Sequence, residues 1–487
     1  MKKSEYKRIC ITYPPFVNNA NIASMNINSQ FSWIDEKYYI YPLLPASAAT
    51  LLKHYHYNVM FLDTIIKRLN AVEWFDILES FSPDIIFLEV RTPTINYTWD
   101  TIDILKDKLP NTIIVIGGDH VTSLPEESFE NSKVDFIITG GDYDVLLLSI
   151  ANHLNNRELK LEKGILYRNT KGNIKNTGKC LLNYDLDKIP FIDRDLTNWK
   201  LYSNNNIIFR KKPATFIMSG RGGIDSNYNS VASNILFPNA RFRSPSNVVS
   251  EIFYLYKRYR IKEFFDITNS FPEEDWLLEF YSSMKEKKLN NKVYIDCYSN
   301  LKKHSSNYYQ LLKKCGVKTL LFNLPSGSNR TLDFFNVCNS IDGIIQNIKY
   351  AKMYGLIVYL NIHIGYPFET AEDIISTFTV LKDIMIKGYV SFIDVSLFVP
   401  YPNTKLFNYC KENNLLATEN WFDYDMRRSV MKLNISDEDL FQYMNYFYNL
   451  SFNPSYLFHK IIRIKNIYDL KFYFNSVKNL IAKQIKS

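Results

Sequence analysis

The chain has 487 residues, of which 46% are hydrophobic and 22% charged, with 35 tyrosines and 33 phenylalanines. This composition excludes an extended disordered chain, and the length suits two or three domains. The net charge of +8 is spread along the sequence, and no stretch approaches the ~20 apolar residues that span a bilayer. We therefore expect a folded cytoplasmic protein with no membrane span and no nucleic-acid partner.

The first part of the chain alternates short apolar runs with helical patterns. Strand-like runs lie at 9–13, 59–62, 85–90, 112–116 and 136–139. Helical stretches such as 45–54 and 99–108 fall between them. Short, wholly apolar strands separated by helices are typical of a parallel sheet covered on both faces. We predict a doubly wound α/β domain over 1–155, with its ligand at the carboxyl ends of the strands.

A connector is predicted at 156–205, where a polar run separates two weak strand-like pieces. The alternation of strand and helix then resumes and continues to about residue 420. Six strand-plus-helix units fit there, at Phe216, Phe264, Val293, Thr319, Val358 and Ile393. Six units favour a partial barrel over a closed barrel of eight.

Capping signals mark helix starts in the second half of the chain. Ser244 precedes Pro245, and Thr370 is followed three residues later by Asp373. Beyond about 420 the pattern turns helical and aromatic, and Ser436 opens another helix. We expect a helical region over 421–487.

Six cysteines are present, at 10, 180, 297, 315, 338 and 410. No two of them form a CxxC or CxxxC pair. Scattered thiols in a reducing compartment are most simply reduced core residues. We interpret Cys297, on the third barrel strand, in this way.

Polar and glycine-rich segments follow the strands of the first domain. They are YPP at 13–15, RTPT at 91–94, GGDHVTSLPE at 117–126 and GGDYD at 140–144. Glycines at a strand end let a flat ligand or a phosphate approach the backbone, although tight packing turns account for them equally well. As an ordered set, the segments resemble the cobalamin-binding domain that is fused to radical S-adenosylmethionine proteins.

The resemblance implies a cobalamin site over the carboxyl edge of the sheet, because these loops surround the nucleotide tail and lower face of cobalamin in that family. It assigns cofactor contacts to Thr92, Pro93, Thr94, Gly117, Gly118, His120, Gly140 and Gly141. The loop at 14–19, where other cobalamin domains place a histidine ligand, contains no histidine. We expect cobalamin to bind without histidine ligation, and we interpret His120 as a loop residue.

The resemblance continues through the second domain to about residue 415. The matching segments are RFRSPSNVVSEIFYLYKRY at 241–259, LPSGSNRTLD at 324–333, HIGYPFETAEDI at 363–374 and FVPYPNTKLF at 398–407. They imply a partial (β/α)6 barrel of radical S-adenosylmethionine type over 206–420, placed between the cobalamin-binding domain and the helical region.

One loop departs from the family where its chemistry resides. After the first barrel strand the family reads roughly SRGCxxxCxxC, and the three thiolates hold a four-iron four-sulfur cluster that chelates S-adenosylmethionine. In this chain the three positions are Gly223, Asn227 and Ser230. Neither a glycine nor an amide replaces a soft thiolate. We expect no conventional cluster and no metal site, and S-adenosylmethionine binding stays open.

Positions that lie near S-adenosylmethionine in relatives have changed as well. Pro325 replaces a glutamate at the end of the fourth barrel strand, and Thr268 and Asn269 stand where the second strand usually carries carboxylates. The apolar periodicity around these positions is nevertheless intact. This combination indicates a domain that still folds while its reactive pocket has been rewritten.

Three functions are compatible with the sequence. The leading one is a cobalamin-binding pseudoenzyme that acts as a binding, carrier or partner subunit, with an active paralogue or another protein as its partner. The second is a cobalamin-dependent, methyltransferase-type enzyme that acts without a cluster on a small-molecule or peptide substrate. The third is a radical methyltransferase with unusual cluster ligands.

For an enzyme, polar residues at the ends of the barrel strands are the candidate catalytic groups. They are Asp225, Asp266, Asp296, His363, Asp394 and Tyr401. A functional set should share one cavity and include a perturbed pKa, whereas scattered orientations favour the binding subunit.

Overall fold

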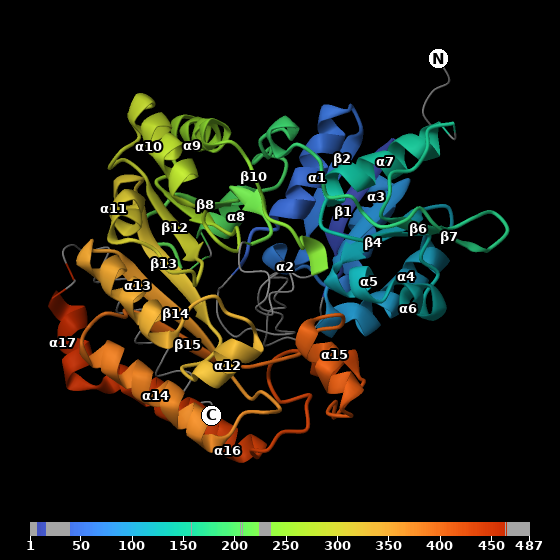
Figure 1. Cartoon of the computed structure of the whole chain (residues 1–487). Helices are drawn as coiled ribbons and strands as arrows, with labels where there is room; N and C mark the ends of the chain where they lie inside the picture. Colours follow the sequence, from blue (N-terminus) through green and yellow to red (C-terminus); the bar gives the residue numbers. More distant parts are fainter. Residues whose placement is uncertain are drawn as a thin grey trace.

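The computed structural model describes residues 7–15, 39–156, 158–204, 206, 208–223, 235–462 and 464. Two α/β units lie side by side in Figure 1, and helices from the end of the described chain pack below and beside the second unit. The architecture confirms the fold class predicted from the sequence.

The first unit is a seven-stranded sheet with the order β2-β1-β3-β4-β5-β6-β7. Its first five strands are parallel, and each confirms a predicted run: β1 (Arg8–Tyr13), β2 (Asn58–Asp63), β3 (Ile85–Val90), β4 (Ile113–Gly118) and β5 (Phe136–Ile138). The strand order reverses between β1 and β3. Such a switch point is where open α/β sheets bind their ligands.

Helices cover both faces of this sheet. They are α1 (Leu43–His54), α2 (Thr64–Lys67), α3 (Ala71–Phe81), α4 (Ile95–Lys108), α5 (Asp119–Ser123), α6 (Pro125–Asn131) and α7 (Tyr143–Asn155). All six residues of β3 are buried, as expected for a central strand packed on both sides. One apolar core lies on each face of the sheet.

The sheet continues into the segment interpreted as a connector. Strands β6 (Ile165–Arg168) and β7 (Ile174–Asn176) add antiparallel to its β5 edge. The chain then passes through a 3-10 turn, η2 (Leu186–Lys188), and helix α8 (Trp199–Asn204) to the second unit.

The second unit is a six-stranded parallel sheet with the order β15-β14-β13-β12-β11-β8. Its strands are β8 (Ala214–Ile217), β11 (Glu263–Asp266), β12 (Tyr294–Ser299), β13 (Val317–Leu324), β14 (Ile357–Ile364) and β15 (Phe392–Leu397). They match the six predicted units in number and place. A short antiparallel pair, β9 (Gly220–Arg221) and β10 (Arg241–Phe242), leaves the sheet after β8.

Helices follow the strands of this partial barrel: α9 (Pro245–Tyr259), α10 (Glu274–Glu286), α11 (Ser306–Lys314), α12 (Asn329–Phe334), α13 (Ile341–Met353), α14 (Ala371–Ile386) and α15 (Lys405–Glu412). Ser244 accepts a hydrogen bond from the Asn247 amide at the start of α9, and Thr370 with Asp373 forms a capping box on α14. The predicted caps are therefore confirmed.

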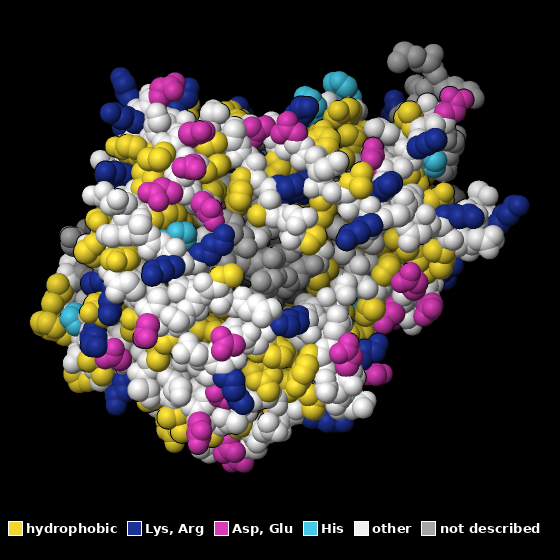
Figure 2. Space-filling model, in the orientation of Figure 1, with side chains coloured by type: hydrophobic (Ala, Val, Ile, Leu, Met, Phe, Trp, Pro, Cys, Tyr) yellow, Lys and Arg dark blue, Asp and Glu magenta, His cyan; other side chains and the backbone are white. Residues whose placement is uncertain are grey.

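The C-terminal part contains η4 (Trp421–Asp423), α16 (Asp437–Asn449), η5 (Leu450–Phe452) and α17 (Pro454–Ile462). The Ser436 cap of α16 is present. Within the described ranges, no helix is long and apolar enough to cross a membrane. Basic and acidic side chains are interspersed over the face in Figure 2, in agreement with the even charge distribution of the sequence.

Candidate cofactor site at the domain junction

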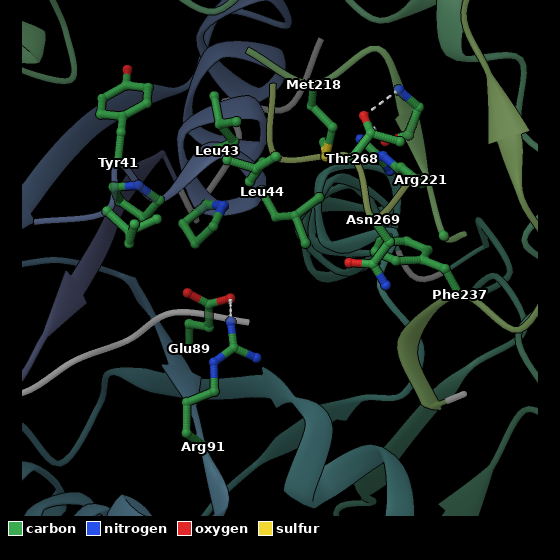
Figure 3. Close-up of a pocket in the computed structure, with 16 residues that line it drawn as sticks. Tyr41, Leu43, Leu44, Glu89, Arg91, Met218, Arg221, Phe237, Thr268 and Asn269 are labelled. Carbon is green, nitrogen blue, oxygen red and sulfur yellow. Dashed lines mark hydrogen bonds and ion pairs between the residues drawn. The ribbon is translucent and has the colours of Figure 1, made fainter. Parts of the chain in front are cut away.

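A pocket of about 520 Å³ lies between the two units, beside the switch point of the first sheet. Figure 3 shows side chains from both units around it. The first unit contributes residues 40–45, Glu89 and Arg91, and the second contributes Met218, Gly220, Arg221, Gly222, Phe237, Ile267, Thr268 and Asn269. A ligand in this pocket would therefore contact both domains.

Glu89 and Arg91, at the end of β3, belong to a buried charge cluster. The Arg91 guanidinium lies 2.6 Å from Glu89 Oε1 and 3.1 Å from Asp119 Oδ1, and its side chain is wholly buried. Tyr13 donates its phenolic hydrogen to Glu89 from the end of β1. Burial raises the pKa of Glu89, whereas Arg91 opposes that rise. The cluster forms a charged wall in an otherwise mainly apolar pocket.

Arg221 joins the two units through a second buried cluster. Its Nη1 lies 2.7 Å from Asp142 Oδ1, and its Nη2 lies 2.5 Å from Asp144 Oδ2. Ser47 donates to Asp144, and Arg241 also binds Asp142. Burial alone would raise the pKa of Asp144, but Arg221 outweighs that effect and the pKa falls below its ordinary value. This cluster fixes β9 and β10 against the start of α7.

A second pocket of about 460 Å³ lies next to the first and shares four of its lining residues. Leu43, Met218, Gly220 and Arg221 line both pockets. The rest of its lining is mainly apolar and comes from residues 186–192 of the connector, together with Arg243 and Glu251. Arg221 therefore lies between two cavities as well as between two domains.

The threonines and glycines assigned to cofactor binding lie at the predicted sheet edge, and Thr92, Pro93 and Thr94 form a buried 3-10 turn, η1 (Thr92–Thr94). The Thr92 hydroxyl donates to Asp119 Oδ2 at 3.1 Å, and the Thr94 hydroxyl donates to the Arg91 carbonyl oxygen at 3.1 Å. Both hydroxyls therefore already have partners within the protein.

Close packing accounts for the two glycines of β4. A Cβ atom on Gly118 would overlap the Val90 carbonyl oxygen, and one on Gly117 would lie 3.1 Å from the Phe87 ring. Gly118→Leu would therefore disturb the β3–β4 pair before it could test ligand approach.

Gly141 contributes to the contact between the two units, whereas Gly140 packs against the connector. A Cβ atom on Gly141 would overlap the Phe237 ring, and the Gly141 amide donates to the Leu236 carbonyl oxygen at 3.1 Å. Gly140 has a φ of +82° and packs against Cys180. None of the eight predicted cofactor residues lines either pocket, although Arg91, which lines the first pocket, directly precedes Thr92 in the chain.

His120 is buried between the first unit and the C-terminal part. Its Nε2 lies 3.2 Å from Glu127 Oε2, the same oxygen that accepts a hydrogen bond from the Trp421 indole at 3.0 Å. The imidazole packs edge-on against the rings of Trp99 and Trp421. These contacts agree with the interpretation of His120 as a structural residue.

Gly223 is the only former cysteine position within the described residues; Asn227 and Ser230 lie outside them, as does Asp225. The start of this loop is held by hydrogen bonds, because the Gly220 amide donates to Thr268 Oγ1 at 3.0 Å and Thr268 donates back to the Gly220 carbonyl oxygen at 3.1 Å. Gly222 has a φ of +86° and packs closely against the Phe237 and Asn239 carbonyl oxygens.

Cys297 lies wholly buried on β12, the third strand of the barrel sheet, and burial raises the pKa of its thiol. This environment suits a core cysteine. Among the residues that the structure describes, no three histidine, cysteine, aspartate or glutamate side chains gather closely enough to hold a metal ion.

The five candidate catalytic residues that lie within the described ranges do not line a common pocket. Asp266 is buried and accepts hydrogen bonds from Ser219 and from the Thr268 amide. Asp296 is the third residue of the six-residue strand β12 and pairs with Arg210 at 3.2 Å, close to Glu263. Burial, with a contribution from Asp296, raises the pKa of Glu263 to about 8.

His363 and Asp394 lie on adjacent strands and are the two candidates that the fold brings together. His363 Nδ1 lies 2.9 Å from Ser396 Oγ, and Tyr448 donates to Asp394 Oδ1 at 3.1 Å. Burial lowers the pKa of His363 to about 4, against the opposing effect of Asp394. Tyr401 lies elsewhere, in an apolar cluster with Tyr366 and Phe398.

Sequence reasoning missed Glu89, Arg91 and Arg221. The sequence contained a signal for Glu89 and Arg91, which interrupt and end the apolar run IIFLEVR at 85–91. A charged residue on a buried central strand needs a partner of opposite charge, so this pair could have been noticed. Asp142 and Asp144 lie in the recognised segment GGDYD, but their role in docking the domains depends on the tertiary structure.

Comparison with known proteins supports the two-domain assignment. A model of the B12 binding domain matches residues 37–147, and a model of the radical SAM superfamily matches residues 227–381. The chain belongs to the radical S-adenosylmethionine protein family whose members contain a cobalamin-binding domain.

Among its relatives is an uncharacterized methyltransferase of Pyrococcus horikoshii, which is 27% identical over 397 residues that cover 80% of this chain and 83% of the relative. An anaerobic magnesium-protoporphyrin IX monomethyl ester cyclase of Rubrivivax gelatinosus is 22% identical over 72% of this chain and 62% of its own length.

Two solved structures have the same fold. The cobalamin-dependent S-adenosylmethionine radical enzyme OxsB, solved with aqua-cobalamin and S-adenosylmethionine, aligns over 98% of this chain and 71% of its own, with a TM-score of 0.72 and 15% identity. The radical S-adenosylmethionine methyltransferase TsrM of Kitasatospora setae aligns over 84% of this chain and 75% of its own, with a TM-score of 0.63 and 13% identity.

Proposed function

We propose that this protein binds cobalamin at the domain junction and acts as a binding, carrier or partner subunit that needs no iron-sulfur cluster. One observation carries the proposal: a pocket at the switch point of a B12-binding sheet faces a barrel whose cluster loop has Gly223, Asn227 and Ser230 in place of thiolates. A binding subunit requires the pocket and not the thiolates.

The residues around the pocket fit part of a corrin. Cobalamin is a flat, largely apolar macrocycle with amide-bearing arms, and the pocket combines apolar side chains such as Leu43, Leu44 and Met218 with the polar pair Glu89 and Arg91. When bound, cobalamin would supply a cobalt centre that can carry a methyl group, and these residues would hold and orient the ring.

The residues do not fit a four-iron four-sulfur cluster. Such clusters are held by cysteine thiolates, and none stands at the three positions of the family motif. The base of the loop is instead fixed by Arg221 and by the hydrogen bonds between Gly220 and Thr268. No step of the proposed function therefore passes through a cluster.

Methyl transfer without a cluster is the second candidate, and a relative named as a methyltransferase favours it. The group formed by His363, Ser396, Asp394 and Tyr448 would contact the substrate. The pKa of about 4 keeps His363 neutral at pH 7, so that it can exchange hydrogen bonds with a polar substrate but cannot supply a positive charge.

Cobalamin retention tests the proposal directly. Protein mixed with hydroxocobalamin and passed through gel filtration should retain a corrin spectrum at about one equivalent per chain. Gly141→Trp, which places a large side chain where Phe237 packs, should reduce retention by displacing the pocket wall at Phe237. A wild-type protein that elutes free of corrin would exclude cobalamin binding.

A further inference from the structure

The charge balance beside the pocket limits what can bind there. Among the residues that the structure describes, Arg91 is the one cation of its cluster, and it lies between two carboxyl groups, those of Glu89 and Asp119. Tyr13 and Tyr143 are the other titratable groups close to Arg91, and burial raises the pKa of both phenols, so they stay neutral. Burial also raises the pKa of Glu89. Whether Glu89 is charged or protonated, the cluster has no net positive charge.

The same cluster retains hydrogen-bonding capacity. Within the described part of the chain, Arg91 Nε and the Tyr143 hydroxyl are buried and make no hydrogen bond of ordinary geometry, although the Arg91 side chain lies close enough to the Tyr143 hydroxyl to lower the pKa of that phenol. A buried polar group left without a partner costs about 1–3 kcal/mol and therefore calls for an explanation. Arg91 lines the pocket, and Figure 3 shows its guanidinium and the Glu89 carboxylate projecting toward the pocket space.

We propose that Glu89 and Arg91 form a subsite for an uncharged carboxamide arm of the corrin, and that this subsite rejects an anionic arm. A primary amide offers a carbonyl oxygen to the Arg91 guanidinium and an N–H group to Glu89, so it satisfies donor and acceptor together. A carboxylate or phosphate would meet Glu89 and Asp119 at close range without a free cation to balance it.

The inference deepens the proposed cobalamin binding and rests on it. It also implies that the amide arms and the nucleotide tail of cobalamin contact different parts of the protein. The amide arms would face Glu89 and Arg91, so the phosphate of the nucleotide tail would lie away from this cluster. The hydroxyls of Thr92 and Thr94, assigned to the cofactor from the sequence, already have partners within the cluster.

The test compares hydroxocobalamin with its monocarboxylic acids, in which one propionamide arm is hydrolysed to a carboxylate. Dissociation constants are measured by absorbance titration at neutral pH for each isomer. We expect wild-type protein to bind at least one isomer about tenfold more weakly than the intact amide form. Glu89→Gln and Asp119→Asn, which each replace a carboxyl group with an uncharged amide of similar shape, should each reduce that difference to about threefold or less.

Asp84→Asn is the matched control, because Asp84 precedes the opposite end of β3 and pairs with Arg8. It should leave the wild-type preference unchanged. Circular dichroism confirms that each variant is folded, and the wild-type preference decides the question even if a variant is not. Equal binding of the amide and of every acid isomer would overturn the subsite while leaving cobalamin binding intact. Failure to bind any corrin would instead refute the proposed function, and the subsite with it.

Discussion

Replacing Arg221 with methionine should destabilise the protein by about 3–5 kcal/mol of unfolding free energy, because the change leaves Asp144 buried without its cation. Methionine keeps the length and apolar contacts of the arginine stem, so the lost charge is the main change. Chemical denaturation measures the effect. Limited proteolysis should also show earlier cleavage around β9 and β10, since Arg221 holds this hairpin on the first domain.

Two comparisons isolate the Arg221 bridge. Arg258→Met removes an arginine from an exposed pair with Asp195, and such a pair contributes little to stability. The double variant Arg221→Met with Asp144→Asn should cost less than the sum of its single changes, because it removes the unpaired buried carboxylate. If Arg221→Met proves no more damaging than Arg258→Met, the bridge does not hold the domains together.

Introducing cysteine at all three motif positions should raise the amount of iron that the protein takes up. Gly223→Cys, Asn227→Cys and Ser230→Cys together recreate the thiolate set that such clusters require. We expect partial cluster uptake after anaerobic reconstitution, visible as a charge-transfer shoulder and as iron bound to the chain. We expect no 5'-deoxyadenosine from S-adenosylmethionine, because Thr268, Asn269 and Pro325 stand where the family resemblance implies acidic groups.

The control for the restored chain is the same triple substitution to alanine, which should bind no iron. Rapid formation of 5'-deoxyadenosine by the triple cysteine variant would show that only the ligands have been lost. Thr268 in the pocket would then not prevent the cleavage of S-adenosylmethionine.

The fold could be predicted from the sequence because its strands are short, apolar and regularly spaced. All five parallel strands of the first sheet and all six strands of the barrel fall where the apolar runs lie. The runs at β6 and β7 were recognised as strand-like, but nothing in a short polar hairpin shows that it adds to the edge of β5. Pairing across a sheet edge depends on contacts that sequence periodicity does not encode.

The candidate site was predictable only in outline. The ordered loops placed a ligand at the carboxyl edge of the first sheet, and the pocket lies beside that edge. The individual donors were not predictable, because Asp119 stands 28 residues from Arg91 and Asp144 stands 77 residues from Arg221. Both contacts depend on how the strands align and how the two domains dock. Gly118, which the family resemblance assigns to the cofactor, also permits close packing against β3.

The candidate catalytic residues show the same limit. His363 and Asp394 occupy inward positions on adjacent strands, where barrel periodicity places them together. Asp296 lies nearer the opposite end of the barrel with Arg210, and Tyr401 packs among aromatic side chains. Residue type and strand number do not predict these different surroundings. Burial and pairing decide whether a carboxylate is free to bind a substrate or is already paired with an arginine.

The central claim is that the chain binds cobalamin but does not assemble a four-iron four-sulfur cluster. Counting corrin and iron on the same sample tests it most directly, after anaerobic reconstitution with iron, sulfide and hydroxocobalamin and removal of unbound material. The account predicts about one corrin per chain and iron at the level of the triple alanine control. About four iron atoms per chain, or no retained corrin, would contradict it.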